Sequence, residues 1–339
     1  MIETRPICIA GAGSIGCFVG GILAAAGRDV AMLARQRIVK SIETYGLRLT
    51  SFEGLDQCLA PGQLRLSDDP AAIMSEAKII LVAVKSGDTA EMARLIADHA
   101  AKDAIVVSLQ NGVGNVGVLR AALPGRRILG GMVPFNVIAK GDGHVHRATS
   151  GNIVVERDGA DTASALSVPH LAVLASDDIV GVQWGKLLVN LNNALNALSD
   201  TPLRSQLAQR AWRSLFADQM AEGLAVLKVA GIKPISATPI PARLTPHLLR
   251  LPDGLFNMLL GRTMKIDANA RSSMWEDLQR DRRTEIDYLQ GVIVELAAKY
   301  QITAPLSLRV MTLIKHAETS GRGAPALTPD QIRSERDID

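Results

Sequence analysis

Lys186 and the asparagines that follow it are the residues of this sequence best suited to chemistry. Between positions 190 and 196, four of the seven residues are asparagine, a middling-to-poor helix former, in an otherwise apolar segment. At about 100° per residue, an α-helix places Lys186, Asn190 and Asn193 on one face. The leucines around them indicate that this helix is largely buried. A buried face with one ammonium group and two amides needs polar partners, and a bound keto acid would supply them.

Burial would also change the chemistry of Lys186. It disfavours the charged form of a lysine and lowers its pKa, and such a lysine can act as a general acid. The alternative interpretation is the exposed polar face of an ordinary helix. Asn192 and Asn196 fall outside the face of Lys186, and we expect them to bond to other helices or to solvent.

Two later segments begin like helices and carry further polar candidates. Ser273 with Glu276 has the spacing of a capping box, so Ser273 is expected to be a helix N-cap, with or without a functional role. Thr284 with Asp287 resembles a second capping box. Glu285 would then lie in the first turn of its helix, where the helix dipole favours an ionised carboxylate. Such a glutamate could hold a protonated lysine or bond to a substrate hydroxyl.

A glycine pattern near the N-terminus predicts a dinucleotide site. Residues 11–16 lie between an apolar strand at Ile7–Ala10 and a helix at Ile15–Ala26. The first glycine permits a tight turn, the second lets the backbone approach the pyrophosphate, and the third lets the helix pack against the strand. The alternative is a glycine-rich turn without a ligand, but the strand and helix favour a cofactor site. Its residues are Gly11, Ala12, Gly13, Ser14, Ile15 and Gly16.

The residues after the second strand favour NADP over NAD. Sites for NAD place an acidic residue at the end of that strand, where it bonds to the ribose hydroxyls. Here the strand Val30–Ala34 is followed by Arg35, Gln36 and Arg37, none of which is acidic. An arginine can pair with the 2′-phosphate of NADP through two parallel hydrogen bonds. The alternative is that both arginines are solvated surface charges.

Two more polar residues follow apolar strands. Lys85 comes directly after Ile79–Val84, and Asn111 lies just beyond Ala104–Leu109. The carboxyl ends of parallel strands face the ligand crevice, so Lys85 could neutralise phosphate and Asn111 could contact a ligand. The alternatives are a surface lysine and an Asn-Gly turn.

Strands that alternate with helices predict an α/β fold, with an N-terminal Rossmann-type, doubly wound parallel sheet. After residue 128 the pattern changes to strands at Ile128–Ala139, His144–Thr149 and Asn152–Glu156, the first two joined by an Asp-Gly turn. We expect this segment to extend the sheet in antiparallel fashion. Residues 157–178 are expected to form a polar connection with a short helix.

From Val182 onward the periodicity predicts an all-helical C-terminal domain. Its helices are expected at Val182–Leu198, Leu203–Ala230, Ser273–Arg282, Glu285–Tyr300 and Pro305–Thr319. The proline-rich stretch 233–255 should be irregular. The predicted domains are therefore an NADP-binding domain at 1–178 and a helical domain with the substrate and catalytic residues at 179–320. Residues 321–339 form a polar tail, either frayed or docked.

Composition excludes several other classes of protein. The 339 residues exceed the roughly 250–300 that one core usually holds, and the net charge of +3 gives no reason to expect nucleic acid. The chain shows no signal peptide and no apolar run of about 18 residues, so we expect no membrane and a cytoplasmic enzyme. Three scattered cysteines form no disulfide framework, and the six histidines include no close ligand pair on a helix, so no metal is expected. A homodimer is possible, although the sequence does not give the oligomeric state.

Taken together, these motifs resemble the ketopantoate reductase (2-dehydropantoate 2-reductase) family, over nearly the whole chain and in the same order. The set is much more specific than any one of its members. It comprises Gly-x-Gly-x-x-Gly at 11–16, Arg35, Val84-Lys85, Gln110-Asn111-Gly112, Trp184-Gly185-Lys186-Leu187 with Asn190, Ser272-Ser273-Met274 and Thr284-Glu285-Ile286-Asp287-Tyr288.

The resemblance implies reduction of 2-dehydropantoate to pantoate by NADPH, in pantothenate and coenzyme A biosynthesis, with the site in a cleft between the two domains. It implies that Lys186 is the general acid that protonates the keto oxygen and that Glu285 is the family's catalytic glutamate. Residues with substrate or cofactor contacts would be Asn111, Asn190 and Ser273. Arg35 and Lys85 would bind the 2′-phosphate.

Two departures from the family's pattern bear on the substrate. The family commonly has a second asparagine eight residues after the lysine, where this chain has Ala194. Either the neighbouring Asn193 takes over the contact, or the pocket differs. Residues 240–268 are also longer than in a minimal member. The alternatives are therefore a reductase of another branched 2-oxo acid on the same scaffold, and an NADP-binding regulator without catalysis, although Lys186 and Glu285 are both present.

Overall fold

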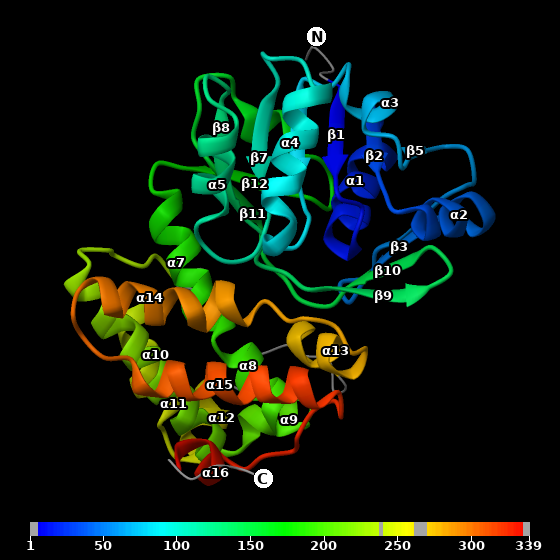
Figure 1. Cartoon of the computed structure of the whole chain (residues 1–339). Helices are drawn as coiled ribbons and strands as arrows, with labels where there is room; N and C mark the ends of the chain where they lie inside the picture. The colour runs from blue at the N-terminus through cyan, green and yellow to red at the C-terminus, as the bar shows by residue number, and fades with distance from the viewer. Residues whose placement is uncertain (1–5, 237–239, 261–269, 335–339) are drawn as a thin grey trace. The chain divides into compact units, whose positions relative to one another are not determined.

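The computed structural model of the chain describes residues 6–236, 240–260 and 270–334. The chain divides into two compact units, Met1–Val180 and Gly181–Asp339 (Figure 1). The charged N-terminal residues 1–5, and residues 261–268 of the stretch predicted to be long, lie outside the described residues.

The N-terminal unit is built on an eight-stranded sheet with the order β12-β11-β8-β7-β6-β1-β2-β5. Every pair in it is parallel except β11 with β8. The predicted doubly wound sheet is therefore confirmed. Its strands are β1 (Ile7–Ala10), β2 (Val30–Leu33), β5 (Arg65–Ser67), β6 (Ile79–Val82), β7 (Ile105–Ser108), β8 (Ile128–Met132), β11 (Ile153–Glu156) and β12 (Val173–Ser176).

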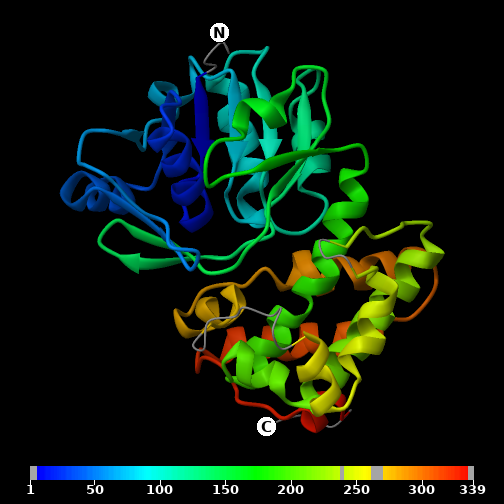
Figure 2. The same cartoon turned by 180° about the vertical axis from the view of Figure 1, so that it is seen from behind.

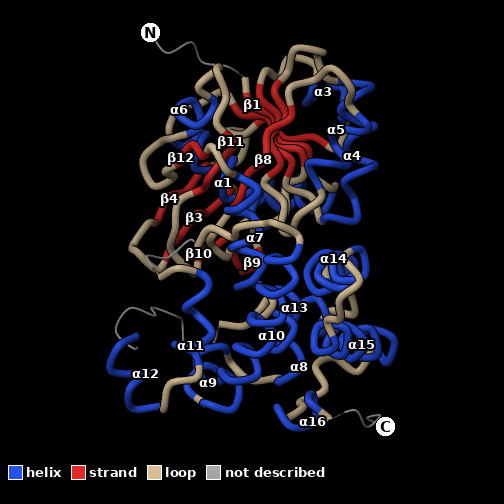
Figure 3. The backbone as a smooth tube through the Cα atoms, turned by 90° about the vertical axis from the view of Figure 1, so that its left-hand side faces the viewer, coloured by secondary structure: helices blue, strands red, loops and turns tan. Residues whose placement is uncertain are grey.

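The central strands are apolar because both faces of the sheet are covered. All four residues of β1, β2, β6 and β7 are buried, which is typical of a parallel sheet between two layers. One layer contains α1 and the other contains α3, α4 and α5, so the unit has two apolar cores (Figure 3). The helices of the unit are α1 (Ser14–Ala25), α2 (Gln36–Tyr45), α3 (Pro70–Met74), α4 (Thr89–His99), α5 (Asn115–Ala122) and α6 (Thr162–Leu166).

A second, four-stranded sheet with the order β4-β3-β10-β9 was not predicted. The single strand expected at Ile128–Ala139 is two strands in different sheets, since β8 ends at Met132 and β9 begins at Val137. Pro134 lies in the gap, where it has no N–H to donate to a sheet. The expected hairpin does form, but in the second sheet, whereas the expected antiparallel extension of the first sheet is made by β11 against β8. The strands of this sheet are β3 (Leu47–Ser51), β4 (Asp56–Leu59), β9 (Val137–Gly141) and β10 (His144–Arg147).

The described residues of the C-terminal unit form helices joined by loops, with no strand, as expected. Its first helix, α7 (Ile179–Asn190), begins two residues before the division between the units. Figure 2 shows the green-to-yellow helices α8 to α12 from behind. The further helices are α8 (Asn192–Ser199), α9 (Leu203–Ala208), α10 (Arg210–Val229), α11 (Thr245–Leu249), α12 (Asp253–Leu260), α13 (Ser273–Gln279), α14 (Val292–Lys299), α15 (Pro305–Ser320) and α16 (Pro329–Arg333).

Three of the long helices predicted for this unit are interrupted. Val182–Leu198 is broken at Leu191, between α7 and α8. Leu203–Ala230 is broken at Gln209, whose backbone is extended with φ −96° and ψ 121°. Glu285–Tyr300 begins instead with a π-helix at Asp287–Gly291, and only then continues as α14. Apolar periodicity runs through all three breaks, so it could not reveal them.

The two least regular predicted segments also contain helix. The proline-rich stretch forms a 3₁₀ turn at Ala242–Leu244 and then α11 and α12. The tail docks through α16, because Ile332 is fully buried. The Leu327 N–H also donates a hydrogen bond to the Leu198 carbonyl over 2.8 Å, a usual length for such a bond.

Candidate functional site

The glycine loop of the N-terminal unit has the shape that a pyrophosphate site needs. A side chain on Gly16 would overlap the backbone oxygen of Gly11, so this position requires glycine for α1 to approach β1. Gly11 has a φ of +109°, which disfavours any other residue. Gly13, in contrast, faces open space. It precedes α1, and no side chain caps that helix, so the first N–H groups of α1 are available to an anion.

Three further predicted cofactor residues lie at the same edge of the sheet as this loop. Arg35 follows β2, Lys85 follows β6 and Asn111 follows β7, while β2, β1, β6 and β7 are adjacent in that order. The chain turns to opposite sides of the sheet between β1 and β6, which is where doubly wound folds bind ligands. All three side chains belong to exposed residues. The fold therefore brings these predicted residues together with the glycine loop.

Arg35 has an acidic neighbour that sequence reasoning missed. One of its guanidinium nitrogens lies 3.5 Å from a carboxylate oxygen of Asp88. Both side chains are well exposed, at 77% and 47%. Asp88 is distant in sequence and reaches Arg35 because it follows β6, which is separated from β2 by β1 alone. A ligand phosphate at Arg35 would have to compete with this carboxylate.

A buried polar network holds the Asn111 loop in place. The side-chain amide of Asn115 donates to the Asn111 carbonyl over 2.8 Å, and the Ser86 hydroxyl donates to the same carbonyl over 3.0 Å. Thr89 bonds to Asn115 over 2.9 Å and accepts from Gln110 over 2.7 Å. The network fixes the backbone of Asn111 and leaves its side chain exposed. Its members follow β6 and β7, a shared location that could have indicated them.

In the C-terminal unit, Lys186 lies on α7 and is partly buried. Loss of hydration lowers the pKa of Lys186 to about 8. The residue before it has to be glycine, because a Cβ on Gly185 would overlap the carbonyl of Ile235. The Ile235 N–H also donates to the Gly181 carbonyl over 2.8 Å, so this loop lies directly on α7. Packing therefore requires glycine at position 185, next to the lysine that is the candidate for the chemistry.

The two asparagines predicted to share the face of Lys186 lie on different helices. Asn190 is buried on α7 and Asn193 is partly exposed on α8. Asn196 is fully buried and bonds to other segments, because its side-chain oxygen accepts from the Ser272 N–H over 2.8 Å and its amide donates to Gln206 over 3.0 Å. Asn192 also donates to Gln206, over 3.4 Å. Asn192 and Asn196 are therefore structural residues.

Ser273 is not the helix N-cap that its spacing predicted. The N-cap of α13 is Ser272, whose hydroxyl accepts from the Trp275 N–H over 3.1 Å and bonds to the Asn193 carbonyl over 2.8 Å. Ser273 is the first residue of the helix and is exposed. The cap shifted by one residue because Ser272 is held on α8 by Asn193 and Asn196. Ser273 therefore does not supply the cap.

Glu285 precedes its helix instead of lying in the first turn. The π-helix begins at Asp287, and the Glu285 carbonyl accepts from the Tyr288 N–H over 3.0 Å. The Thr284 hydroxyl accepts from Ile286 over 3.2 Å rather than from Asp287, so the second predicted capping box is also displaced. The Thr284 N–H donates to Glu318 on α15 over 2.7 Å. Glu285 is partly buried on this anchored segment.

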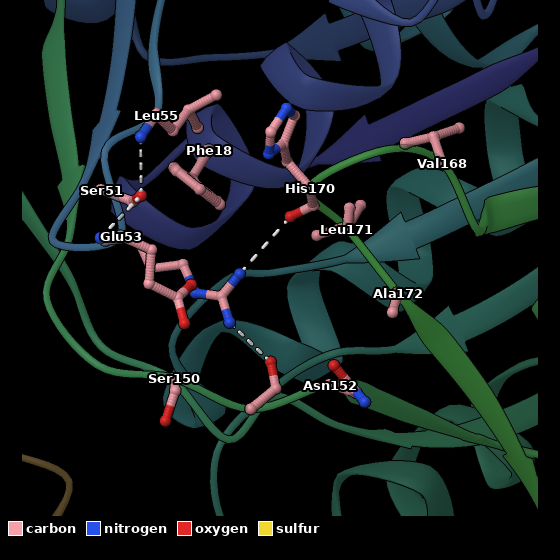
Figure 4. Close-up of a pocket in the computed structure, with 12 residues that line it drawn as sticks. Phe18, Ser51, Glu53, Leu55, Ser150, Asn152, Val168, His170, Leu171 and Ala172 are labelled. Carbon is pink, nitrogen blue, oxygen red and sulfur yellow. Dashed lines mark hydrogen bonds between the residues drawn. The ribbon is translucent and has the colours of Figure 1, made fainter.

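A cavity of about 410 Å³ in the N-terminal unit is lined by none of the predicted residues (Figure 4). Figure 4 shows Ser51 accepting two hydrogen bonds on one side, with His170 and Leu171 on another. Arg147 also lines it, but its guanidinium donates to the carbonyls of Thr149, Gly151 and His170 and lies 4.3 Å from the centre of the Phe135 ring. This arginine thus joins three segments of chain.

Comparison with known proteins decides which family these features belong to. Residues 7–159 match the family description "Ketopantoate reductase PanE/ApbA", and residues 178–318 match its C-terminal part. The chain belongs to the ketopantoate reductase family. It is therefore an oxidoreductase, and a regulator without catalysis is not supported.

Relatives of this ketopantoate reductase family member align over nearly their whole length. The 2-dehydropantoate 2-reductase of Halobacterium salinarum is 28% identical, over 93% of this chain and 99% of the relative. The crystal structure of a PanE/ApbA family ketopantoate reductase from Ralstonia eutropha JMP134 is 31% identical, with a TM-score of 0.79 over 94% of this chain and 99% of that one. D-mandelate dehydrogenase with NADH and anilino(oxo)acetate is 23% identical, with a TM-score of 0.76 over 93% and 99%, which shows a shared fold alone.

One feature of the helices concerns membranes. Among the described residues, no helix is both long enough and apolar enough to cross a bilayer.

Proposed function

We propose that this protein reduces 2-dehydropantoate to pantoate with NADPH, in pantothenate and coenzyme A biosynthesis. The observation that carries the proposal is Lys186. It is a partly buried lysine whose pKa is lowered to about 8, on the same helix as a buried asparagine, in a chain of the ketopantoate reductase family. A lysine with such a pKa is protonated for much of the time near neutral pH and gives up its proton readily.

The N-terminal unit fits a dinucleotide with a 2′-phosphate. The uncapped start of α1 and the open space at Gly13 suit the pyrophosphate. Arg35 and Lys85 are exposed cations after β2 and β6, the two strands on either side of β1, where each could pair with phosphate oxygens. When bound, NADPH would supply the hydride that reduces the substrate's keto carbon.

The residues of this chain would bind the substrate and supply the proton. Lys186 would donate a proton from Nζ to the keto oxygen, which becomes the new hydroxyl oxygen. Asn190 and Asn193 would orient the oxo acid through their side-chain amides, and Ser273 through its exposed hydroxyl. Glu285 would bond to a substrate hydroxyl or hold Lys186 in its protonated form. Asn111 would contact the cofactor or substrate from the N-terminal unit.

The position of Ala194 favours Asn193 as the second asparagine of the substrate site. Ala194 is fully buried on α8, whereas Asn193 next to it is partly exposed. An amide at position 194 would therefore enter the apolar core of this chain, while Asn193 is accessible to a ligand. This arrangement supports retention of the substrate contact at the neighbouring position.

A second candidate is the reduction of another branched 2-oxo acid on the same scaffold. The alanine at position 194, where the family commonly has asparagine, favours it. The same Lys186 and Glu285 would act, but the contacts to the substrate side chain would differ.

The loss of NADPH absorbance with purified protein distinguishes the two candidates. We expect rapid oxidation with 2-dehydropantoate and slow oxidation with 2-oxo acids that lack its hydroxymethyl group, because a site that bonds a hydroxyl discriminates strongly against its loss. Oxidation with another oxo acid alone would establish the second candidate. A protein that binds NADPH but oxidises it with none of these acids would contradict both.

A further inference from the structure

Gln290 is a fully buried amide that joins the two segments with the candidate catalytic residues. It belongs to the π-helix Asp287–Gly291, which begins two residues after Glu285. Its Nε2 donates a hydrogen bond to the Leu191 carbonyl, 2.9 Å away in space and 99 residues earlier in the chain. Leu191 is the residue at which the helix with Lys186 and Asn190 is interrupted.

The two ends of this hydrogen bond have matching places in their segments. Leu191 follows Lys186 by five residues, and Gln290 follows Glu285 by five residues. One is a break between two α-helices and the other is a π-helix, a rare form that occurs mostly as a single turn and often at functional sites. Lys186 therefore lies about one turn before the first irregularity and Glu285 lies two residues before the second, and the Gln290 amide connects the two.

The amide is a costly way to fill this part of the core. The Oε1 atom of Gln290 has no hydrogen-bond partner among the described residues, although it is buried. Leaving a buried acceptor unpaired costs free energy, which an apolar side chain of similar volume would avoid. The bond from Nε2 is thus the contact that the amide makes and that leucine or methionine could not.

Packing brings the same two segments against a third helix. Gly223 on α10 lies beside Leu188, Leu191 and Ile293, and a Cβ there would come within 2.8 Å of Leu188 and 3.6 Å of the other two. Side chains of α7 and α14 therefore meet over a glycine that lets them approach. The apolar contacts bring the segments together, but such contacts are non-directional and leave their register to be set by a directional bond.

We propose that Gln290 is a positioning residue, whose hydrogen bond to the Leu191 carbonyl sets the placement of Glu285 relative to Lys186. The inference rests on the proposed function, in which these two side chains act on one substrate. A misplacement of about 1 Å can cost on the order of 100-fold in rate without removing any reacting group. Loss of this bond should therefore lower kcat more than it weakens cofactor binding.

The test compares Gln290→Met with Gln219→Met in the full chain. Methionine keeps the volume of glutamine but has no N–H. Gln219 is the matched control, since it is a fully buried glutamine of the same unit whose amide atoms have no partner among the described residues. We would measure kcat, the KM values for NADPH and for the oxo acid, and the midpoint of thermal unfolding for each variant.

We expect Gln290→Met to lower kcat at least about tenfold while the KM for NADPH stays within about twofold of the wild type. Gln219→Met should keep the wild-type kcat. If Gln290→Met does not fold, Gln290→Asn keeps the amide but is one methylene too short to reach Leu191, and should show the same loss of kcat.

Three results would overturn the inference. A folded Gln290 variant with wild-type kcat would overturn this inference and leave the proposed function standing. So would losses of kcat in Gln290→Met and Gln219→Met that are proportional to their losses of thermal stability. A wild-type protein that reduces no 2-oxo acid would overturn the proposed function and this inference together.

Discussion

Lys186 and Arg35 are both cations, but their surroundings give them different properties. Lys186 is partly buried on α7, and loss of hydration lowers its pKa to about 8. Arg35 is exposed at the end of β2 and lies 3.5 Å from Asp88. The first suits the transfer of a proton, which needs a group that both holds and releases it. The second suits the recognition of a phosphate, which needs a permanent charge in a fork-shaped arrangement.

Removal of the Lys186 ammonium should abolish proton donation without affecting the cofactor. We expect Lys186→Ala to lose at least about 100-fold in turnover, with little change in the Kd for NADPH. Steady-state kinetics and a fluorescence titration with NADPH would measure the two. Near-normal turnover in this variant would remove Lys186 from the mechanism.

The lowered pKa of Lys186 also predicts the pH dependence of the wild type. A general acid must be protonated in the free enzyme, so kcat/KM for the oxo acid should be level below about pH 8 and should fall as the pH rises through that value. A pH profile of kcat/KM would test this. If kcat/KM rose across the same range, the group would be acting as a base.

Arg35 and Asp88 should change the affinity for NADPH in opposite directions. Arg35→Ala should weaken NADPH roughly 10- to 100-fold and NADH much less, since only NADPH has the 2′-phosphate. Asp88→Asn should strengthen NADPH by roughly two- to fivefold, because exposed ion pairs are weak and a competing carboxylate is removed. Titrations with both cofactors would check this, and equal changes for NADPH and NADH would contradict the 2′-phosphate assignment.

The sequence predicts the partners of a residue when they are close in the chain, and not when they are distant. Helix geometry predicted that Asn192 and Asn196 would bond to other segments, and both donate to Gln206. The face predicted for Lys186, Asn190 and Asn193 assumed one continuous helix, whereas the helix is interrupted at Leu191. The cap at Ser272 could not be predicted from spacing, because the choice between two adjacent serines is made by Asn196, 76 residues away. Asp88 was missed for a similar reason, since only the folded sheet brings it to Arg35.

At the scale of elements, the helices of the C-terminal unit are positioned by glycines and by interruptions. Gly185 lets the Ile235 loop lie on α7, and Gly223 lets α7 and α14 approach α10. Hydrophobic periodicity predicted where helix occurs, but it continued through Leu191 and Gln209 without a sign of the breaks. The break at Leu191 coincides with a tertiary hydrogen bond from Gln290, which a single sequence does not display.

Gly185→Ala tests the packing of α7. Its Cβ would overlap the Ile235 carbonyl, so we expect the free energy of unfolding to fall by about 1–3 kcal/mol as the loop is displaced. The matched control is Gly254→Ala on α12, where a Cβ meets open space. That change should be neutral or stabilising by up to about 1 kcal/mol, because alanine favours helix. Denaturant unfolding would measure both, and equal stability of the two variants would contradict the contact at Ile235.

At the scale of the whole molecule, the chain is two units, each with part of the candidate site. The predicted cofactor residues Gly11 to Gly16, Arg35 and Lys85 belong to the first unit, and the predicted catalytic residues Lys186 and Glu285 belong to the second. The fold class of each unit could be predicted from the sequence, since each unit repeats one period over a long stretch. The second sheet was missed because its strands are short and partly exposed, and therefore lack a strong pattern.

The docked tail should contribute to the stability of the second unit. Leu327 and Ile332 are buried, and the Leu327 N–H donates to Leu198 at the end of α8. Removal of residues 322–339 should therefore cost about 3 kcal/mol or more of unfolding free energy. Ile332→Ala in the full chain should cost about 2–5 kcal/mol, which separates side-chain burial from the loss of the segment. Wild-type stability in the truncated chain would show that the tail contributes nothing.

The central claim is that this protein transfers a hydride from NADPH to the keto carbon of 2-dehydropantoate. The most direct measurement uses NADPH with deuterium at the reacting position of the nicotinamide, followed by mass spectrometry and NMR of the product. We expect pantoate with one deuterium on C2 for each NADPH oxidised. Oxidation of the cofactor without deuterium on C2, or the absence of pantoate, would contradict it.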